Sequence, residues 1–294
     1  MRPARGRPGG RPLPAAAGFQ KGPLSLARAL SKFGVCSRRE AERRIEDGRV
    51  AVDGLVVRAP MRRIDPRKDV ITVDGVRAGD ETERVAIALH KPVGYITSRT
   101  DPGGRLTVYE LIHGLDRWVF PVGRLDRDTS GLLILTNDHR LGHRLTDPGH
   151  HVPKSYHVRV RGLPGDEALR ALAEGVPLGD GTVGRGAAAS RPAAVRPLGS
   201  GRGGGCPGDP PGPGTSWLEI VLTEGRNRQV RRMCAAVGHD VLELVRVAIG
   251  GLTLGPPREE RVPVPPHWVR CDLAPGEWRI LDAASLAVLE GDPR

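Results

Sequence analysis

A single carboxylate between two arginines is the arrangement in this sequence that most strongly suggests chemistry. Asp126 lies in Gly123-Arg-Leu-Asp-Arg-Asp-Thr-Ser-Gly131, which the apolar run Leu132–Leu135 follows at once. A carboxylate in such a turn could be a nucleophile, a general base, a metal ligand or a residue that shapes the turn. Asp128 could supply a second carboxylate, although in this turn it more readily caps backbone N–H groups. No further acid or histidine completes a ligand set by spacing, so we expect no metal.

A basic cluster later in the chain, Gly225-Arg-Asn-Arg-Gln-Val-Arg-Arg232, supplies a reason for a charged aspartate. We expect Asn227 to cap a helix that buries Val230, Met233, Cys234 and Val237 and ends at Gly238. Cations in the first turns of a helix oppose its dipole, at about 0.3–1 kcal/mol each. A local anion, either phosphate or a carboxylate of the site, would offset that cost. The cations concerned are Arg226, Arg228, Arg231 and Arg232.

Tyr156 is the third candidate, since the chain has only three tyrosines, four tryptophans and three phenylalanines. On a strand over 154–160 it shares a face with Lys154, Val158 and Val160, so it lies either in the core or in a site. The two lysines of this part of the chain, Lys91 and Lys154, stand beside loops that contain proline, and we expect both to face the site.

Composition favours a polyanionic partner. The net charge is +11 and the pI is near 10.3, which is typical of proteins that bind nucleic acid. The four cysteines have no zinc-ligand spacing and are expected to be reduced thiols in a cytosolic protein. No apolar run is long enough to span a membrane, and the N-terminus lacks the apolar region of a secretory signal.

The elements that position these residues fall into two predicted domains. Residues 1–22 are expected to be a disordered basic arm. Leu26, Leu30 and Phe33 then recur at helical spacing, and a capping box at 37–40 opens a second helix with Ala41 and Ile45 inward. Residues 50–57 predict a hairpin around an Asp-Gly turn. The result is a small helix–helix–hairpin domain over residues 23–73.

The larger domain is predicted over residues 85–283, after a linker at 74–84. Five strands are expected, at 85–89, 118–122, 132–135, 154–160 and 217–222, with Lys91 in a loop at 90–94. Strands outnumber helices and neighbouring elements differ in type, which predicts an α+β fold around a mixed or antiparallel sheet. Residues 199–214, rich in Gly and Pro, predict a flexible excursion with Cys206 exposed, and residues 284–294 a tail that frays.

The first of these domains resembles the S4 RNA-binding domain over residues 24–73. The alternative is an ordinary solvated helix face, which is the usual fate of a charge run. The resemblance implies that the following residues lie on or near an RNA face: Arg28, Lys32, Ser37, Arg38, Arg39, Glu42 and Arg43.

Behind it, Gly-Arg-Leu-Asp126-x-Asp-Thr-Ser-Gly, Lys-x-Tyr156 and Thr-Glu-Gly-Arg-Asn-Arg-Gln-Val-Arg231-Arg-Met follow in order. Together they resemble the RsuA/RluB/RluE/RluF family of ribosomal RNA pseudouridine synthases, and RluB-type members most. The resemblance covers about residues 24–280 and implies that Asp126 is the catalytic aspartate, that Arg231 pairs with it and that Tyr156 stacks on the target base. Arg124 would enter the RNA stack when the uridine leaves it, and Lys91 would support the site and contact RNA. The remaining RNA contacts would come from Lys154, Arg226, Arg228 and Arg232.

The implied reaction detaches uracil from C1′, turns it and rejoins it through C5, and it needs no cofactor. Asp126 could add to the base, attack C1′ or take the C2′ proton; the sequence leaves all three open. We expect a cytoplasmic, monomeric isomerase acting on 23S rRNA, with 16S rRNA as the alternative. Two rival functions remain open: a synthase acting on tRNA or mRNA, and a non-catalytic RNA-binding or ribosome-assembly factor.

Overall fold

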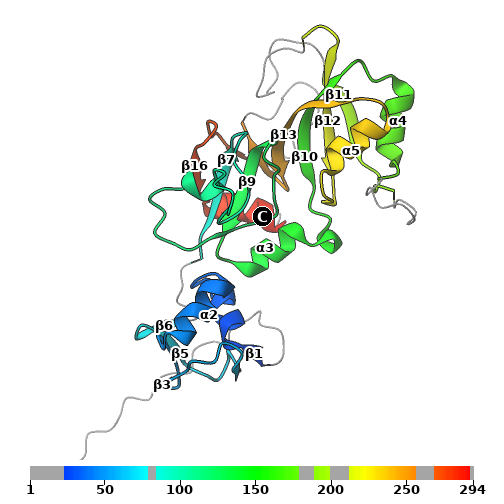
Figure 1. Ribbon diagram of the computed structural model, residues 1–294. Coiled ribbons are helices and arrows are strands. Elements are labelled where there is room, and N and C mark those ends of the chain that lie inside the picture. The colour runs from blue at the N-terminus through cyan, green and yellow to red at the C-terminus, as the bar shows by residue number, and fades with distance from the viewer. Residues whose placement is uncertain (1–22, 79–83, 179–188, 199–211, 256–267, 292–294) are drawn as a thin grey trace, which may run out of the picture. The chain divides into compact units, whose positions relative to one another are not determined.

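The computed structural model describes residues 23–78, 84–178, 189–198, 212–255 and 268–291 (Figure 1). The chain divides into two compact units, Met1–Glu83 and Arg84–Arg294. Both contain helices packed on sheets that mix local hairpins with longer connections, so the α+β fold class is confirmed. The predicted basic arm, most of the excursion at 199–214 and Cys206 lie outside the described residues.

The first unit packs two short helices against small antiparallel sheets. Leu26, Leu30 and Ile45 are fully buried in its core. The predicted N-cap is present, because the Ser37 hydroxyl accepts a hydrogen bond from Glu40 N at 3.1 Å. The other half of the predicted capping box is replaced by ion pairs from Glu40 to Arg43 and Arg44. The elements are β1 Leu24–Ser25, α1 Leu26–Lys32, α2 Arg38–Glu46, β2 Val50–Val52, β3 Leu55–Val56, β4 Arg63–Ile64, β5 Ile71–Val73 and β6 Val76–Ala78.

Strand β6 corrects the predicted linker at 74–84. It pairs with β5 across an Asp74-Gly75 turn in which both residues have positive φ, 51° and 80°. The predicted Asp53-Gly54 turn between β2 and β3 has the same form, with φ of 52° and 80°. Positive φ at both central positions defines the turn type that Asp-Gly favours in hairpins. The second Asp-Gly pair therefore extends the first unit's sheet beyond residue 73.

The second unit is built on one large mixed sheet, in the order β11-β12-β10-β13-β9-β7-β16. Neighbours in this order are antiparallel except β13 and β9, which run parallel where Arg246 pairs with Gly131; off this order, β14 and β15 also pair in parallel. The strands are β7 Ala86–Lys91, β8 Phe120–Pro121, β9 Ser130–Thr136, β10 Lys154–Arg161, β11 Ala194–Leu198, β12 Thr215–Leu222, β13 Val241–Ile249, β14 Leu252–Leu254, β15 Val269–Cys271 and β16 Trp278–Ile280.

Helices cover this sheet at two places. Helices α3 (His139–Thr146) and α6 (Ala283–Glu290) pack over one face of β7 and β9, where Leu132 and Ile134 are fully buried. Helices α4 (Asp166–Glu174) and α5 (Gln229–Ala236) form another core with β10 and β12. Two short 3-10 helices, Val108–Glu110 and Pro148–His150, complete the unit. Strand β9 lies between β13 and β7 in the sheet, so the loop that precedes it and carries Asp126 starts from a fixed position.

The C-terminal tail predicted to fray instead forms helix α6. Asp282 caps the helix by accepting a hydrogen bond from Ser285 N at 2.8 Å, and Gly291 ends it with φ 68°. Leu289 is buried in the core beneath α3. A capping aspartate and a terminal glycine are ordinary helix boundaries, so the sequence did carry the signal. The strand predicted at 118–122 shortens to β8, Lys91 belongs to β7, and strands β11 and β13–β16 were not predicted.

Other expectations concern thiols and membranes. Within the described ranges, Cys36, Cys234 and Cys271 form no disulfide, and all three are buried. No helix among the residues described is long and apolar enough to cross a membrane.

Candidate active site

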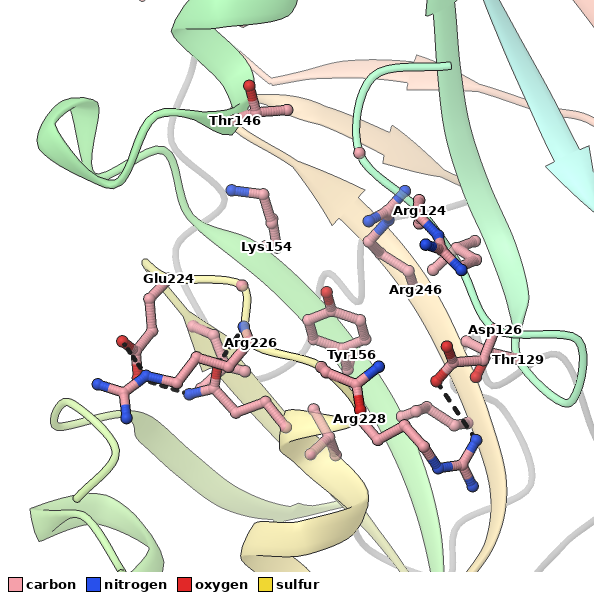
Figure 2. A pocket seen from close by; sticks show the side chains of 18 of the residues that line it. Arg124, Asp126, Thr129, Thr146, Lys154, Tyr156, Glu224, Arg226, Arg228 and Arg246 are labelled. Carbon is pink, nitrogen blue, oxygen red and sulfur yellow. Dashed lines mark hydrogen bonds and ion pairs between the residues drawn. The ribbon is translucent and has the colours of Figure 1, made fainter. Parts of the chain in front are cut away.

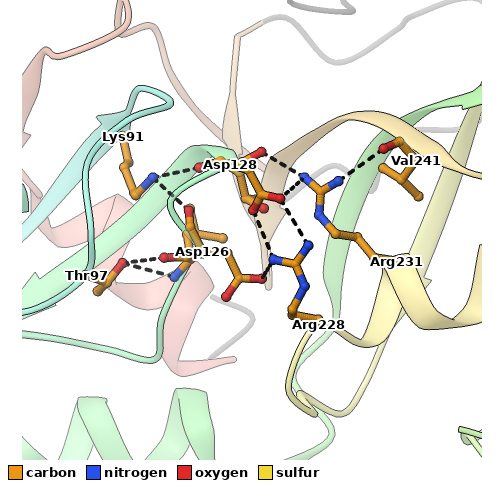
Figure 3. Close-up of polar contacts among 9 residues, drawn as sticks. Lys91, Thr97, Asp126, Asp128, Arg228, Arg231 and Val241 are labelled. Atoms are coloured by element: carbon orange, nitrogen blue, oxygen red, sulfur yellow. Dashed lines mark hydrogen bonds and ion pairs between the residues drawn. The ribbon is translucent and has the colours of Figure 1, made fainter. Parts of the chain in front are cut away.

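The loop that carries Asp126 is held in place by a buried lysine (Figure 3). Lys91 is fully buried, and its Nζ donates to the carbonyl oxygens of Asp126 at 3.0 Å, Thr129 at 2.7 Å and Pro92 at 3.1 Å. An ammonium has three donors, so these carbonyls use all of them. Burial lowers the pKa of Lys91 to about 8, although Asp126 and Asp128 oppose that shift. The prediction that Lys91 contacts RNA is therefore wrong, and Lys91 instead positions the loop.

A threonine that the sequence did not single out fixes the residue before Asp126. The Thr97 hydroxyl donates to the Leu125 carbonyl at 2.7 Å and accepts from Leu125 N at 3.1 Å. Within the turn, Thr129 N donates to the Asp126 carbonyl at 3.1 Å. The backbone of Asp126 is thus restrained on both sides, while its side chain stays 31% exposed and open to a ligand.

Two arginines of the second cluster reach this loop, but not in the predicted pairing. Arg228 Nη1 lies 3.5 Å from Asp126 Oδ2, and Arg228 also makes a two-pronged contact with Asp128 at 3.3 and 3.1 Å. Arg231, expected to pair with Asp126, instead lies 3.2 Å from Asp128 Oδ2 and donates to the Asp128 carbonyl at 2.8 Å. Burial acts to raise the pKa of Asp128, but these two guanidinium groups outweigh it and lower that pKa.

Asp128 therefore clamps the loop to α5. It was predicted to cap backbone groups of its own turn, but its carboxylate lies against the two guanidinium groups (Figure 3). Arg231 also donates to the Val241 carbonyl at 3.2 Å, which ties the clamp to strand β13. A bidentate guanidinium–carboxylate contact fixes geometry as well as charge.

The start of α5 also differs from the prediction that Asn227 caps it. Arg228 is the N-cap, with a left-handed φ of 47°, and Gln229 is the first helical residue. The Gln229 side chain accepts from Arg226 N at 2.9 Å and donates to Glu224 at 2.6 Å, while Arg226 contacts Glu224 at 3.2 Å. The anion expected to offset the cations is thus present as carboxylates. Val230, Met233 and Cys234 are buried as predicted.

A cavity of about 400 Å³ lies in front of the loop. Asp126 enters it from the loop before β9, and Tyr156 lines it from β10 (Figure 2). Tyr156 is half-buried and packs against the core under α5, so it is both a core residue and a lining residue. Arg124, Lys154, Arg226 and Arg228 also line this cavity; Arg231 and Arg232 are not among its lining residues.

Arg246 is a lining residue that the sequence analysis missed. It is 3% exposed and pairs in register with Tyr156 across β10 and β13. An arginine inside the apolar run 244–249 was the available signal, since a buried charge needs a reason. Gly131 makes room for it: with φ 110°, a Cβ there would overlap the backbone of Arg246. This explains the glycine that closes the Asp126 motif.

One group of residues has the spacing of a metal site, although no metal was expected. His143, Asp147 and His150 bring their ligand atoms within 4.8 Å of one another, and both histidines are exposed. His143 lies 3.5 Å from Asp147, whose other oxygen accepts from Gly149 N at 2.8 Å. These contacts account for the grouping as a local cap and ion pair.

The residues predicted to face RNA in the first unit lie on its two helices. Arg28, Arg38, Arg39 and Arg43 are exposed. Arg38 and Arg43 pair with Glu42 and Glu40 of their own helix. Ser37 and Lys32 are half-buried; the Ser37 hydroxyl is used as the helix cap. Burial and the neighbouring Arg28 lower the pKa of Lys32.

Comparison with known proteins identifies the class to which this fold and site belong. The RNA pseudouridylate synthase family matches residues 85–236, and the S4 domain family matches residues 25–71. A solved pseudouridylate synthase covers 90% of this chain and 99% of its own, with a TM-score of 0.57 and 27% identity. The chain belongs to the RNA pseudouridylate synthase family and carries an S4 domain in front of its catalytic unit.

Individual proteins that are similar to this chain belong to the same class. An uncharacterized RNA pseudouridine synthase of Mycobacterium tuberculosis is 41% identical over 80% of this chain and 87% of its own length. The ribosomal large subunit pseudouridine synthase B of Bacillus subtilis is 36% identical over 83% of this chain and 93% of its own. The protein of the same name in Escherichia coli O6:H1 is 39% identical over 85% and 79%. The chain is an isomerase that makes pseudouridine in RNA.

Proposed function

We propose that this protein converts one uridine of ribosomal RNA to pseudouridine, and that the target lies in 23S rRNA. The observation that carries the chemistry is Asp126: its backbone is fixed by Lys91 and Thr97, and its carboxylate faces the cavity beside Tyr156. The large-subunit target is supported by the relatives named ribosomal large subunit pseudouridine synthase B. We also infer a cytoplasmic enzyme that acts as a monomer.

The geometry supports a division of labour. The target uridine must leave the RNA stack, which costs a few kcal/mol and requires a surface on which the base can stack. Tyr156 offers that surface, and Arg124, exposed at the edge of the cavity, is placed to occupy the vacated position in the RNA. Arg228 Nη1 lies 3.5 Å from Asp126 Oδ2 and so helps to orient the carboxylate that attacks or takes a proton.

Replacing Asp126 tests the catalytic assignment. Asp126→Asn keeps the shape of the residue but removes its charge, so we expect pseudouridine formation to fall by about 10²–10⁴-fold or more. The measurement is sequencing-based mapping of pseudouridine in total RNA from a deletion strain complemented with each variant. Asp240→Asn, at a side chain that is 78% exposed, is the matched control and should restore full modification.

The rival functions give different maps. Modification that persists in the Asp126→Asn strain would return the protein to a non-catalytic role. If the pseudouridine missing from the deletion strain lies in 16S rRNA, tRNA or mRNA, the enzyme has a different target RNA but the same chemistry.

Tyr156 is tested by two substitutions that separate ring from hydroxyl. Tyr156→Phe keeps the stacking surface, and base–aromatic stacking is worth about 1–3 kcal/mol. We expect it to retain most activity, whereas Tyr156→Ala should lose at least about tenfold in single-turnover rate. Equal, undiminished rates in both variants would mean that Tyr156 is only a core residue.

A further inference from the structure

Arg246 places a buried positive charge in the wall of the cavity. Its Nε donates to the Leu132 carbonyl at 2.8 Å, and Arg246 is one of the residues that line the cavity. Its Nη2 is buried and has no hydrogen-bond partner among the residues that the structure describes. A buried guanidinium that keeps an N–H group without a hydrogen bond is costly, so its presence in the wall of the cavity points to a ligand that offsets the cost.

Lys154 adds a second cation to the same cavity. It lies two residues before Tyr156 on β10, and its Nζ donates to the Val152 carbonyl at 3.1 Å. Burial and then the charge of Arg246 lower the pKa of Lys154 to about 8. That effect of one cation on the other shows that the two groups share one electrostatic environment. In Figure 2 both side chains extend into the cavity from adjacent strands.

The carboxylates of the cavity are engaged elsewhere. Asp126 lies against Arg228, and Glu224 is bound by Arg226 and Gln229. Across the described part of the chain, neither Arg246 nor Lys154 has an ion pair with an acid. A neutral ligand such as a uracil carbonyl could accept hydrogen bonds from this pair but could not balance its charge. A phosphodiester does both, because it carries a full negative charge and two free oxygens.

We propose that Arg246 and Lys154 form a phosphate-binding subsite that holds a phosphodiester flanking the flipped uridine. Tyr156 lies directly across from Arg246, so a phosphate held there places the attached nucleoside against the tyrosine ring and within the cavity that Asp126 enters. The pair acts by positioning and makes no bond to the reacting atoms. The inference rests on the proposed function, because it requires an RNA substrate.

The test removes the negative charge of one RNA phosphate and, separately, the positive charge of Lys154. Target RNA is made with one neutral methylphosphonate linkage, either 5′ or 3′ to the uridine, and kcat/KM is measured for wild type and Lys154→Gln. At one linkage we expect the wild type to lose about 10–100-fold, as for a charge-assisted contact. Lys154→Gln should show a loss of similar size on normal RNA and less than about threefold further loss on the modified RNA.

If the losses in kcat/KM from Lys154→Gln and from the methylphosphonate simply multiply at both linkages, the two changes act independently and the subsite is wrong. The subsite is also wrong if neither methylphosphonate lowers kcat/KM of the wild type. A Lys154→Gln defect that neither linkage alters would assign the cations to the base. Arg161→Gln, on the same strand with 70% of its side chain exposed, is the control and should respond to the methylphosphonate as the wild type does. Because Arg246 also braces β9, Arg246→Lys and Arg246→Met are read only after thermal unfolding confirms a folded protein.

The Asp126→Asn protein separates the two proposals. Its dissociation constants for normal and methylphosphonate RNA should follow the pattern expected for kcat/KM. The methylphosphonate should weaken binding by Asp126→Asn, and should weaken it little further when Lys154→Gln is also present. If the wild type modifies RNA but no coupling is found in rates or binding, only the subsite is wrong. If the wild type modifies no RNA, the proposed function itself is wrong.

Discussion

Two helices of this protein begin with clusters of arginine, and the clusters do different things. In α2 of the S4 domain, Arg38 and Arg43 pair with glutamates of the same helix and stay 58% and 68% exposed. At the start of α5, Arg228 and Arg231 pair with Asp126 and Asp128 on a distant loop, and Arg231 is only 14% exposed. The first cluster is a surface that a ligand can reach, whereas the second braces the catalytic loop.

The difference lies in where the carboxylates are. A glutamate three or four residues from an arginine on a helix is always within reach, and such exposed pairs contribute little, about 0.3–0.5 kcal/mol. A carboxylate on another element is reached only if the whole fold places it there. The ion pairs of the α5 arginines with the catalytic loop therefore form only when the fold has brought α5 and that loop together.

The largest expected effect comes from breaking the clamp. Asp128→Asn removes the anion that Arg228 and Arg231 share and leaves the half-buried Arg231 without its ion pair. We expect the single-turnover rate to fall by about 100-fold and stability to fall by about 1–3 kcal/mol, since hydrogen bonds to charged groups are of that size. Rapid-quench kinetics and thermal unfolding measure the two effects. A rate within twofold of wild type would mean that the clamp does not support Asp126.

This contrast also explains what the sequence could predict. The cap at Ser37, the Asp53-Gly54 turn and the inward face of α5 depend on residues a few positions apart, and the structure confirms all three. The same local signals were present at Asp74-Gly75 and around α6, so those errors were avoidable.

The remaining errors depend on distant contacts. Whether Arg228 or Arg231 meets Asp126 is decided by the left-handed turn at Arg228 and by the position of α5 against the loop. Lys91 is buried because the carbonyls of Asp126 and Thr129, in a loop 35 and 38 residues further along the chain, converge on it, which no spacing in the sequence reveals. The motifs identified the residues of the site, but their partners required the fold.

A smaller effect is expected from the exposed arginines of the S4 domain. Arg28→Gln combined with Arg39→Gln should weaken RNA binding by about tenfold at physiological salt and reduce the slope of log K against log salt by about 0.7–0.9 per lost phosphate contact. The rate at saturating RNA should stay within about twofold, because neither residue lies in the catalytic unit. Filter binding over a salt series, with single-turnover kinetics, measures both.

A single variant provides the control for that prediction. Arg77→Gln removes an exposed cation from β6 of the same domain. A loss per residue equal to that of the double variant would show that only net charge matters, and would contradict an RNA face on α1 and α2.

The smallest effect is expected from the α2 counterpart of Asp128→Asn. Glu40→Gln is the same acid-to-amide change, and it also removes a carboxylate shared by two arginines.

The hydrogen bond from Arg44, followed by the charge and hydrogen bond of Arg43, lowers the pKa of Glu40 in the folded protein against the effect of burial. Its contribution is therefore present above the unfolded pKa and is lost as pH falls below about 4.5. We expect thermal unfolding to show a loss of about 0.3–1 kcal/mol at pH 7 and a smaller loss at pH 3, with an unchanged single-turnover rate. A rate loss comparable to that of Asp128→Asn would remove the distinction between the two arginine clusters, because it would make α2 part of the catalytic machinery.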